Sequence, residues 1–156
     1  MKILITGGAG FQGSHLAENL LAQDHKITIL NTPSDRASLN IKKIAPKVKI
    51  IWGSVTDPEI VSKSVREQDV IFHLAAYINV DESLLHPEKI IYTNIMGAIN
   101  VLNAVREYGI RLIFVSSCEV YGDGHENQGF LSETAELRPN NPYASSKAAA
   151  DRICHS

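Results

Sequence analysis

The stretch Gly7-Gly8-Ala9-Gly10-Phe11-Gln12-Gly13 decides the fold class of this chain. It joins a short apolar run at residues 3–6 to a helical pattern with an apolar stripe at residues 16–21. Gly7, Gly10 and Gly13 form G-x-x-G-x-x-G at a place where the chain must turn sharply, let a pyrophosphate approach the backbone and pack a helix tightly on a sheet. The helix N-terminus that follows offers unpaired N–H groups and the positive end of its dipole. We therefore predict that this loop, including Phe11 and Gln12, binds a dinucleotide; the alternative is a tight turn without a ligand.

Outward from this loop, short apolar runs alternate with helical patterns. Strands are expected at residues 3–6, 27–30, 48–52, 70–74 and 112–115. Several of these runs are continuously apolar, which is typical of strands buried on both faces. Five β-α units in series predict an α/β fold, a doubly wound parallel sheet of Rossmann-like type with strand order 3-2-1-4-5.

The helical patterns are bounded by recognisable start and stop signals. Asp57 and Pro58 are typical of an N-cap and a first helical position. Residues 87–108 form the longest expected helix, with Gly109 as its stop. The last helix, at residues 143–156, has no closing glycine or proline. We therefore expect residues 1–156 to be the dinucleotide-binding domain of a longer protein, truncated before its substrate domain.

Composition indicates one compact domain. The chain has 156 residues, 44% of them hydrophobic and 21% charged, with a formal net charge of −2. That charge gives no electrostatic reason to expect nucleic acid or an anionic membrane as a partner. No apolar run is as long as a membrane span, and two cysteines are too few for a disulfide framework, so a cytoplasmic protein is expected. The six histidines show no metal-ligand spacing, so no metal site is expected.

The end of the second strand bears on cofactor choice. A carboxylate usually stands there and selects NAD by binding the adenosine ribose. Asn31 takes that position; it can bind a hydroxyl but would not repel a 2′-phosphate. Arg36 is close enough in sequence to contact such a phosphate, although a solvated loop arginine explains it equally well. NAD is favoured, and NADP is left open.

A second set of residues, in the last part of the chain, indicates a catalytic function. Tyr143 and Lys147 form Y-x-x-x-K, which places both side chains on one helical face. A nearby ammonium favours the phenolate of a tyrosine, which can then take a proton from a carbinol while hydride leaves for the cofactor. Ser117 follows the fifth strand, at the edge where such sheets present groups to a ligand, and could bond the same oxygen.

Four motifs in order resemble the extended short-chain dehydrogenase/reductase family, and within it the NAD-dependent epimerase/dehydratase branch that modifies nucleotide sugars. They are Thr6-Gly7-Gly8-Ala9-Gly10-Phe11-Gln12-Gly13, His73-Leu74-Ala75-Ala76, Ser116-Ser117 with Val120-Tyr121-Gly122, and Pro142-Tyr143-Ala144-Ser145-Ser146-Lys147. The resemblance implies that Tyr143 is the acid/base, Lys147 its activator and a ribose ligand, and Ser117 the group that orients the hydroxyl.

The same resemblance implies further cofactor contacts. Leu74, Ala75 and Ala76 would line the ribose and nicotinamide. Asn94 matches a helix asparagine near the cofactor, or else its amide simply pairs with backbone. Ser54, followed by Val55, replaces the aspartate with which relatives hold the adenine.

The reaction is less closely defined. In 4,6-dehydratases of this family an aspartate and a glutamate follow the hydroxyl residue; here the pair is Cys118-Glu119. Glu119 would join the catalytic set, or it is a charge paired within its loop. The missing aspartate favours a 4-epimerase, with a nucleotide-sugar decarboxylase or 4,6-dehydratase as alternatives. A non-catalytic NAD(P)-binding or redox-sensing module is the alternative from another class. We expect the isolated chain to bind cofactor without turning over sugar, and a homodimer through the helices at 87–108 and 143–156 is compatible with the family.

Overall fold

The computed structural model describes residues 1–123 and 130–156. Its centre is a five-stranded parallel sheet with the order β3-β2-β1-β4-β5, which confirms the predicted fold class and strand order. The strands are β1 (Lys2–Thr6), β2 (Lys26–Asn31), β3 (Lys49–Trp52), β4 (Val70–His73) and β5 (Arg111–Phe114). Each predicted strand boundary lies within one residue of the observed one.

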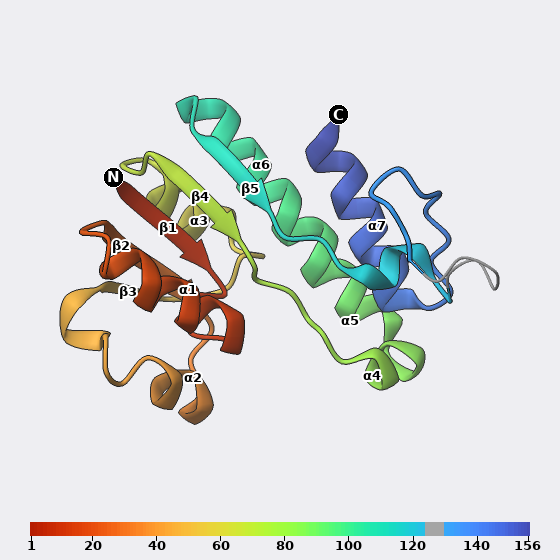
Figure 1. Ribbon diagram of the computed structural model, residues 1–156, viewed down its shortest axis with the longest axis horizontal. Helices are drawn as coiled ribbons and strands as arrows, with labels where there is room; N and C mark the ends of the chain where they lie inside the picture. The colour runs from red at the N-terminus through yellow and green to blue at the C-terminus, as the bar shows by residue number, and fades with distance from the viewer. Residues whose placement is uncertain (124–129) are drawn as a thin grey trace.

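Both faces of the sheet are covered by helices, which makes the sheet doubly wound (Figure 1). Helices α1 (Phe11–Leu21) and α2 (Asp35–Asn40) lie on one face, and α3 (Pro58–Val65) and α6 (Gly97–Tyr108) lie on the other. Alternation along β1 divides the core between the two faces. Ile3 and Ile5 pack toward α1, whereas Leu4 packs toward α3 and α6. The continuous apolar run in β1 is therefore explained by burial on both sides.

The helix expected at residues 87–108 is interrupted, so the prediction of one uniform α-helix was wrong. It consists of α5 (Pro87–Ile91), a π-helical segment, η2 (Tyr92–Met96), and then α6. Residues on either side keep the same apolar spacing, so the sequence does not reveal the wider turn. Such turns are frequent at functional sites, and this one contains the buried Asn94. Gly109, in the left-handed conformation with φ of 65°, ends α6 as expected.

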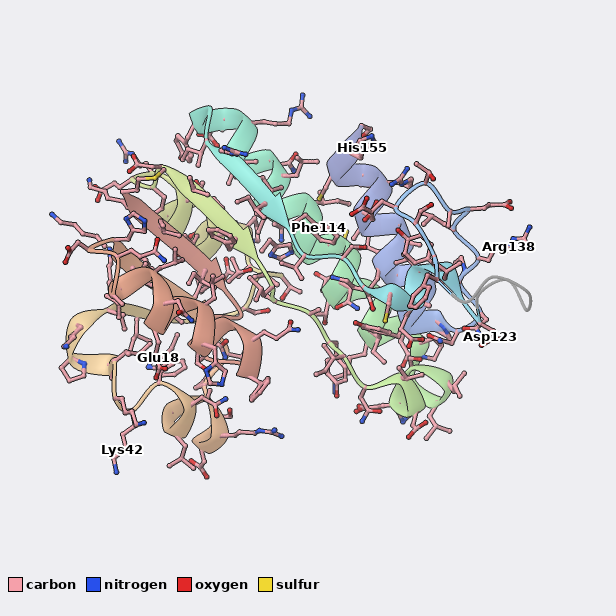
Figure 2. All side chains as sticks on the ribbon, viewed as in Figure 1. Glu18, Lys42, Phe114, Asp123, Arg138 and His155 are labelled. Atoms are coloured by element: carbon pink, nitrogen blue, oxygen red, sulfur yellow. The ribbon has the colours of Figure 1, made fainter. Side chains whose placement is uncertain are left out.

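The last helix, α7 (Pro142–His155), packs against α5, η2 and α6 (Figure 1). Its N-cap is Asn141, whose side chain accepts a hydrogen bond from the Ala144 N–H at 2.8 Å. Figure 2 shows Phe114 at the inner side of this region, whereas Lys42 projects from the outer surface. The sheet, α6 and α7 thus hold the end of β5 close to the start of α7.

Four short elements were not predicted. They are α2, α4 (Val80–Leu85) and two 3-10 turns, η1 (Ala45–Lys47) and η3 (Cys118–Tyr121). A signal for α4 was present, because Asn79 accepts from the Glu82 N–H at 3.0 Å in an N-cap whose third residue is glutamate. Within the two described ranges, no helix is both long and apolar enough to span a bilayer.

Candidate functional site

A cleft of about 730 Å³ opens at the carboxyl ends of the first four strands. The residues that line it follow β1 (Gly7, Gly10, Phe11, Gln12, Gly13), end or follow β2 (Leu30, Asn31, Thr32), follow β3 (Gly53, Ser54, Val55) and follow β4 (Leu74, Ala75, Ala76, Tyr77, Ile78), joined by Lys89, Thr93 and Tyr143. Ligands of open α/β sheets bind at this edge. The cleft therefore joins the predicted phosphate loop and the predicted acid/base in one space.

The glycine loop forms a tight cradle for an anion. Gly7 has a φ of 72°, and a Cβ there would lie 2.8 Å from the Ala75 nitrogen, so a side chain would collide with the neighbouring loop. A Cβ on Gly13 would overlap the Gly7 carbonyl oxygen, which explains how α1 can pack so closely on the turn. Gly10 is the N-cap of α1 and has no side-chain cap. The N–H groups of the first helical turn are therefore available to a phosphate, so the loop fits a dinucleotide.

Three of the four residues predicted near the adenosine line the cleft, and the fourth does not. Asn31 accepts from the Ala9 N–H at 3.1 Å and donates to the Thr32 carbonyl at 2.9 Å, so its amide ties the end of β2 to the glycine loop. Ser54 and Val55 also line the cleft. Arg36 does not: it lies exposed in the first turn of α2, outside the cleft lining.

Behind Leu74, Ala75 and Ala76 lies a buried polar pair. The Thr6 Oγ1 is hydrogen-bonded to the His73 Nδ1 at 2.6 Å and accepts from the Ala75 N–H at 3.3 Å, so one hydroxyl contacts both the imidazole and the loop after β4. Complete burial, and secondarily the charge of Lys147, lower the pKa of His73 to about 3. His73 is therefore neutral at physiological pH and fixes the start of the loop that lines the cleft.

Asn94 is buried and holds the backbone of Tyr77, one of the residues that line the cleft. Its side chain is buried, accepts from the Tyr77 N–H at 2.7 Å, and donates to the Tyr77 carbonyl at 3.1 Å and to the Ser146 hydroxyl at 2.8 Å. The Ser146 hydroxyl donates in turn to the Tyr143 carbonyl at 2.7 Å. The Asn94 amide thus bonds both the Tyr77 backbone and the Ser146 side chain. Through these bonds it links the loop after β4 to α7.

The predicted catalytic residues lie at the junction of β5 and α7. Tyr143 is 9% exposed and lines the cleft. The Lys147 ammonium donates to the Val115 carbonyl at 2.7 Å and lies 4.4 Å from the centre of the Phe114 ring. Burial lowers the pKa of Lys147 to about 8, against the opposing effect of Cys154 and Asp151.

Ser117 and Glu119 lie farther from the cleft. The Ser117 hydroxyl accepts from the Glu119 N–H at 3.3 Å and caps η3, and it lines a separate, polar pocket of about 520 Å³. Glu119 is half-buried and accepts from the Asn141 side chain at 3.4 Å. Neither Ser117, Glu119 nor Lys147 is part of the cleft lining. The structure therefore brings Tyr143, but not these three, to the cleft surface.

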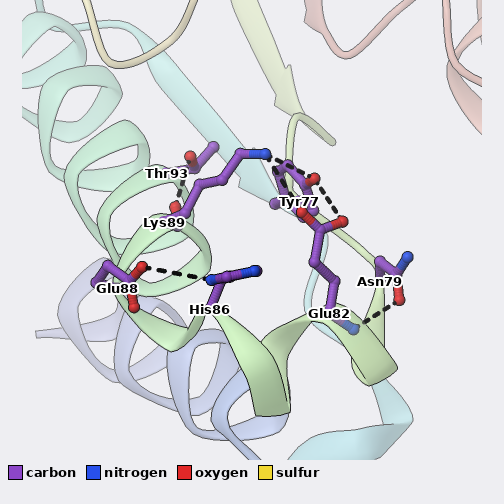
Figure 3. A network of polar contacts seen from close by, with 7 residues as sticks. All are labelled: Tyr77, Asn79, Glu82, His86, Glu88, Lys89 and Thr93. Atoms are coloured by element: carbon purple, nitrogen blue, oxygen red, sulfur yellow. Dashed lines mark hydrogen bonds and ion pairs between the residues drawn. The ribbon is translucent and has the colours of Figure 1, made fainter.

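Sequence reasoning missed one wall of the cleft, formed by Tyr77, Ile78, Lys89 and Thr93. Tyr77 and Ile78 directly follow the segment predicted to contact the cofactor, so their position was the available signal. Lys89 and Thr93 come from the helix expected at 87–108, in which nothing in the sequence distinguishes the turns that face the cleft. Figure 3 shows the polar network on this wall.

These features define a Rossmann-like α/β domain with a cleft at the carboxyl ends of its strands. A family model described as "NAD dependent epimerase/dehydratase family" matches residues 3–156, and the chain belongs to that family. The match confirms the resemblance drawn from the four motifs.

Individual relatives differ in the reactions named for them. A dTDP-glucose 4,6-dehydratase of Mycolicibacterium smegmatis is 37% identical over 98% of this chain and 47% of its own length. A UDP-N-acetyl-alpha-D-glucosaminuronate decarboxylase of Bacillus cytotoxicus is 34% identical over 98% of this chain and 49% of its own length. The structure of a UDP-glucose 4-epimerase of Thermus thermophilus in complex with NAD matches with a TM-score of 0.89 and 34% identity, over 99% of this chain and 50% of that one. The chain spans about half the length of the curated relatives it matches.

Proposed function

We propose that this chain binds NAD in the cleft and, within its whole protein, supports transient oxidation of a hydroxyl group on a nucleotide sugar. The observation that supports this most strongly is that Tyr143 lines the same cleft as the uncapped glycine loop. The NAD-dependent family and a relative crystallised with NAD add support.

The proposed chemistry assigns each residue a separate task. NAD, when bound, supplies a hydride acceptor. The Lys147 ammonium favours the phenolate form of Tyr143. This phenolate takes the proton of the sugar hydroxyl and becomes a neutral tyrosine, while the hydride of the same carbon leaves for the nicotinamide. The Ser117 hydroxyl accepts from the Glu119 N–H and keeps its own hydrogen for donation to the sugar oxygen.

Among the possible outcomes we favour a 4-epimerase. Cys118 stands where 4,6-dehydratases of this family carry an aspartate, and its side chain is exposed. A thiol is a weak hydrogen-bond donor and a poor replacement for a carboxylic acid that assists loss of water.

A decarboxylase or dehydratase is the second candidate. Glu119 supports it, because this half-buried carboxylate sits one residue after Cys118 and contacts the residue that caps α7. The dehydratase and decarboxylase among the relatives give the same support.

Calorimetric titration of the chain with NAD⁺ and, separately, with NADP⁺ tests the cofactor proposal. We expect saturable binding with NAD⁺ the tighter ligand. A folded sample that binds neither dinucleotide would contradict the proposal, and tighter NADP⁺ binding would correct the cofactor.

The whole protein, incubated with NAD⁺ and UDP-glucose, dTDP-glucose or a UDP-uronate, distinguishes the outcomes. We expect a 4-epimer of the sugar; loss of water or of carbon dioxide would instead establish the second candidate. If the whole protein binds NAD⁺ yet converts none of a broad panel of nucleotide sugars, the non-catalytic module becomes the better interpretation.

A further inference from the structure

One wall of the cleft carries a charge that the proposed chemistry does not use. Lys89, in α5, is the single charged side chain among the described residues that line the cleft. The remaining lining residues are neutral, and the glycine loop offers N–H dipoles rather than a full charge. A dinucleotide carries a doubly negative pyrophosphate, so a cation on this wall would balance charge that the backbone alone leaves uncompensated.

Two side chains hold the Lys89 ammonium in place (Figure 3). It donates to the Tyr77 hydroxyl at 2.9 Å and to Glu82 Oε1 at 3.3 Å, and it lies 4.5 Å from the centre of the Tyr77 ring. The Tyr77 hydroxyl donates to Glu82 Oε2 at 2.7 Å. The hydrogen bond with Tyr77, followed by that with Glu82, raises the pKa of Lys89, so the ammonium is charged at neutral pH.

Tyr77 and Glu82, which hold the ammonium, are themselves held in place by residues other than Lys89. The Tyr77 backbone is held by both polar atoms of the Asn94 side chain, and the Glu82 N–H is held by Asn79 at the start of α4. The Lys89 side chain is still 55% exposed. The ammonium is therefore positioned, yet it keeps room to reach a ligand in the cleft.

We propose that Lys89 binds a phosphate oxygen of the dinucleotide pyrophosphate, with Tyr77 and Glu82 holding its ammonium at the cleft wall before the ligand arrives. The inference rests on the proposed function. Glu82 competes with the phosphate for Lys89, so it sets an upper limit on the affinity that this charge can add. The same diphosphate chemistry is present in a nucleotide sugar, and the experiment separates the two sources.

The experiment measures affinity by calorimetry for wild-type chain and for Lys89→Met, which keeps a long apolar side chain and removes the charge. We expect NAD⁺ to bind about tenfold more weakly to the variant at low salt, with a smaller difference at high salt because the interaction is screened. Adenosine, which carries no phosphate, should bind both proteins equally. The matched control is Lys63→Met, which removes a lysine from an exposed pair with Glu59 at 3.5 Å, outside the cleft lining, and should leave every affinity unchanged.

The Glu82→Gln variant should change the NAD⁺ affinity in the opposite direction. Removing the competing carboxylate should tighten NAD⁺ binding about two- to threefold. If Glu82→Gln weakens it as much as Lys89→Met does, the three residues act only as a structural unit and the proposal is wrong.

UDP titrated into the NAD⁺-saturated proteins identifies the source of the diphosphate. If Lys89→Met loses affinity for UDP but not for NAD⁺, Lys89 binds the substrate diphosphate and not that of the cofactor, and the proposal is overturned. Unchanged NAD⁺ affinity in Lys89→Met, with UDP binding unchanged or absent, would overturn it as well. Failure of the wild-type chain to bind NAD⁺ would instead refute the proposed function, so the two failures are distinguishable.

Discussion

The candidate site has two parts, the β1–β2 end of the cleft and the junction of β5 and α7 beside the cleft, and they are built by different means. At the β1–β2 end, backbone forms the site: the glycine loop makes close contacts with neighbouring backbone, and the strand beneath it is fully buried beyond its first residue. At the β5–α7 end, side chains form the site, and β5 is exposed at its first residue and half-buried over the rest. A site made of backbone depends on steric fit, whereas a site made of side chains depends on how elements far apart in sequence are oriented.

This difference predicts that substitutions in the two parts of the site affect different properties of the protein. Changes at the glycine loop should act first on folding and cofactor binding together. Changes at the β5–α7 end should act on chemistry while sparing the fold.

The largest effect is expected for Tyr143→Phe in the whole protein. Removing the hydroxyl deletes the proposed acid/base, so the rate of sugar oxidation should fall by about 10²- to 10⁴-fold. NAD⁺ affinity, measured by calorimetry, should change little, because the ring still fills the cleft wall. A variant that oxidises sugar at the wild-type rate would remove Tyr143 from this role.

Gly13→Ala should follow, because its Cβ would overlap the Gly7 carbonyl oxygen. We expect a loss of about 3 kcal/mol in the free energy of unfolding, measured by urea denaturation. Gly10→Ala is the matched control, since its Cβ would meet only the Gly7 oxygen, at 3.1 Å, and should cost less than about 1 kcal/mol. Equal losses in the two variants would contradict the steric account of the loop.

The buried His73 predicts loss of stability in mild acid. Its folded pKa of about 3 lies below the ordinary value of 6.5, so the unfolded chain binds the proton more tightly between these two pH values. The stabilisation is present above pH 6.5 and is lost as pH falls toward 3. Between about pH 7 and about pH 5 the free energy of unfolding should fall by about 2 kcal/mol through this group. Urea denaturation of wild type and His73→Asn at both pH values measures it, and an equal pH dependence in the two proteins would exclude His73 as the cause.

The smallest effect is expected for Arg36→Ala. Arg36 lies exposed on α2, outside the cleft lining, so the ratio of NAD⁺ to NADP⁺ affinity should change by less than about twofold. A selective loss of NADP⁺ binding would show instead that α2 bends toward the adenosine end when the ligand is bound.

The backbone-built end was the part that sequence could predict. Glycine spacing between a strand and a helix, and continuous apolar runs, report directly on tight turns and on strands buried on both faces. The strand order and the residues of the glycine loop followed from these signals.

At the β5–α7 junction, the sequence predicted which residues take part but not the contacts that they make. Tyr143 and Lys147 were found from their helical spacing, but spacing along one helix does not say that Lys147 would bond the Val115 carbonyl. Ser117 was placed correctly after β5, yet its hydroxyl caps η3 and it lines a separate pocket. The π-helical turn at Asn94 and the wall at Tyr77 and Lys89 depend on packing between distant segments, for which a single sequence carries no local signal.

The central claim is that one bound NAD contacts both the glycine loop and Tyr143, which line the same cleft. Titration of isotope-labelled chain with NAD⁺, followed by nuclear magnetic resonance of the amide groups from Gly7 to Gly13 and of the Tyr143 ring, tests it directly. We expect both sets of signals to shift together and to saturate at the same NAD⁺ concentration. Shifts confined to the glycine loop, with the Tyr143 ring unaffected at saturation, would contradict it.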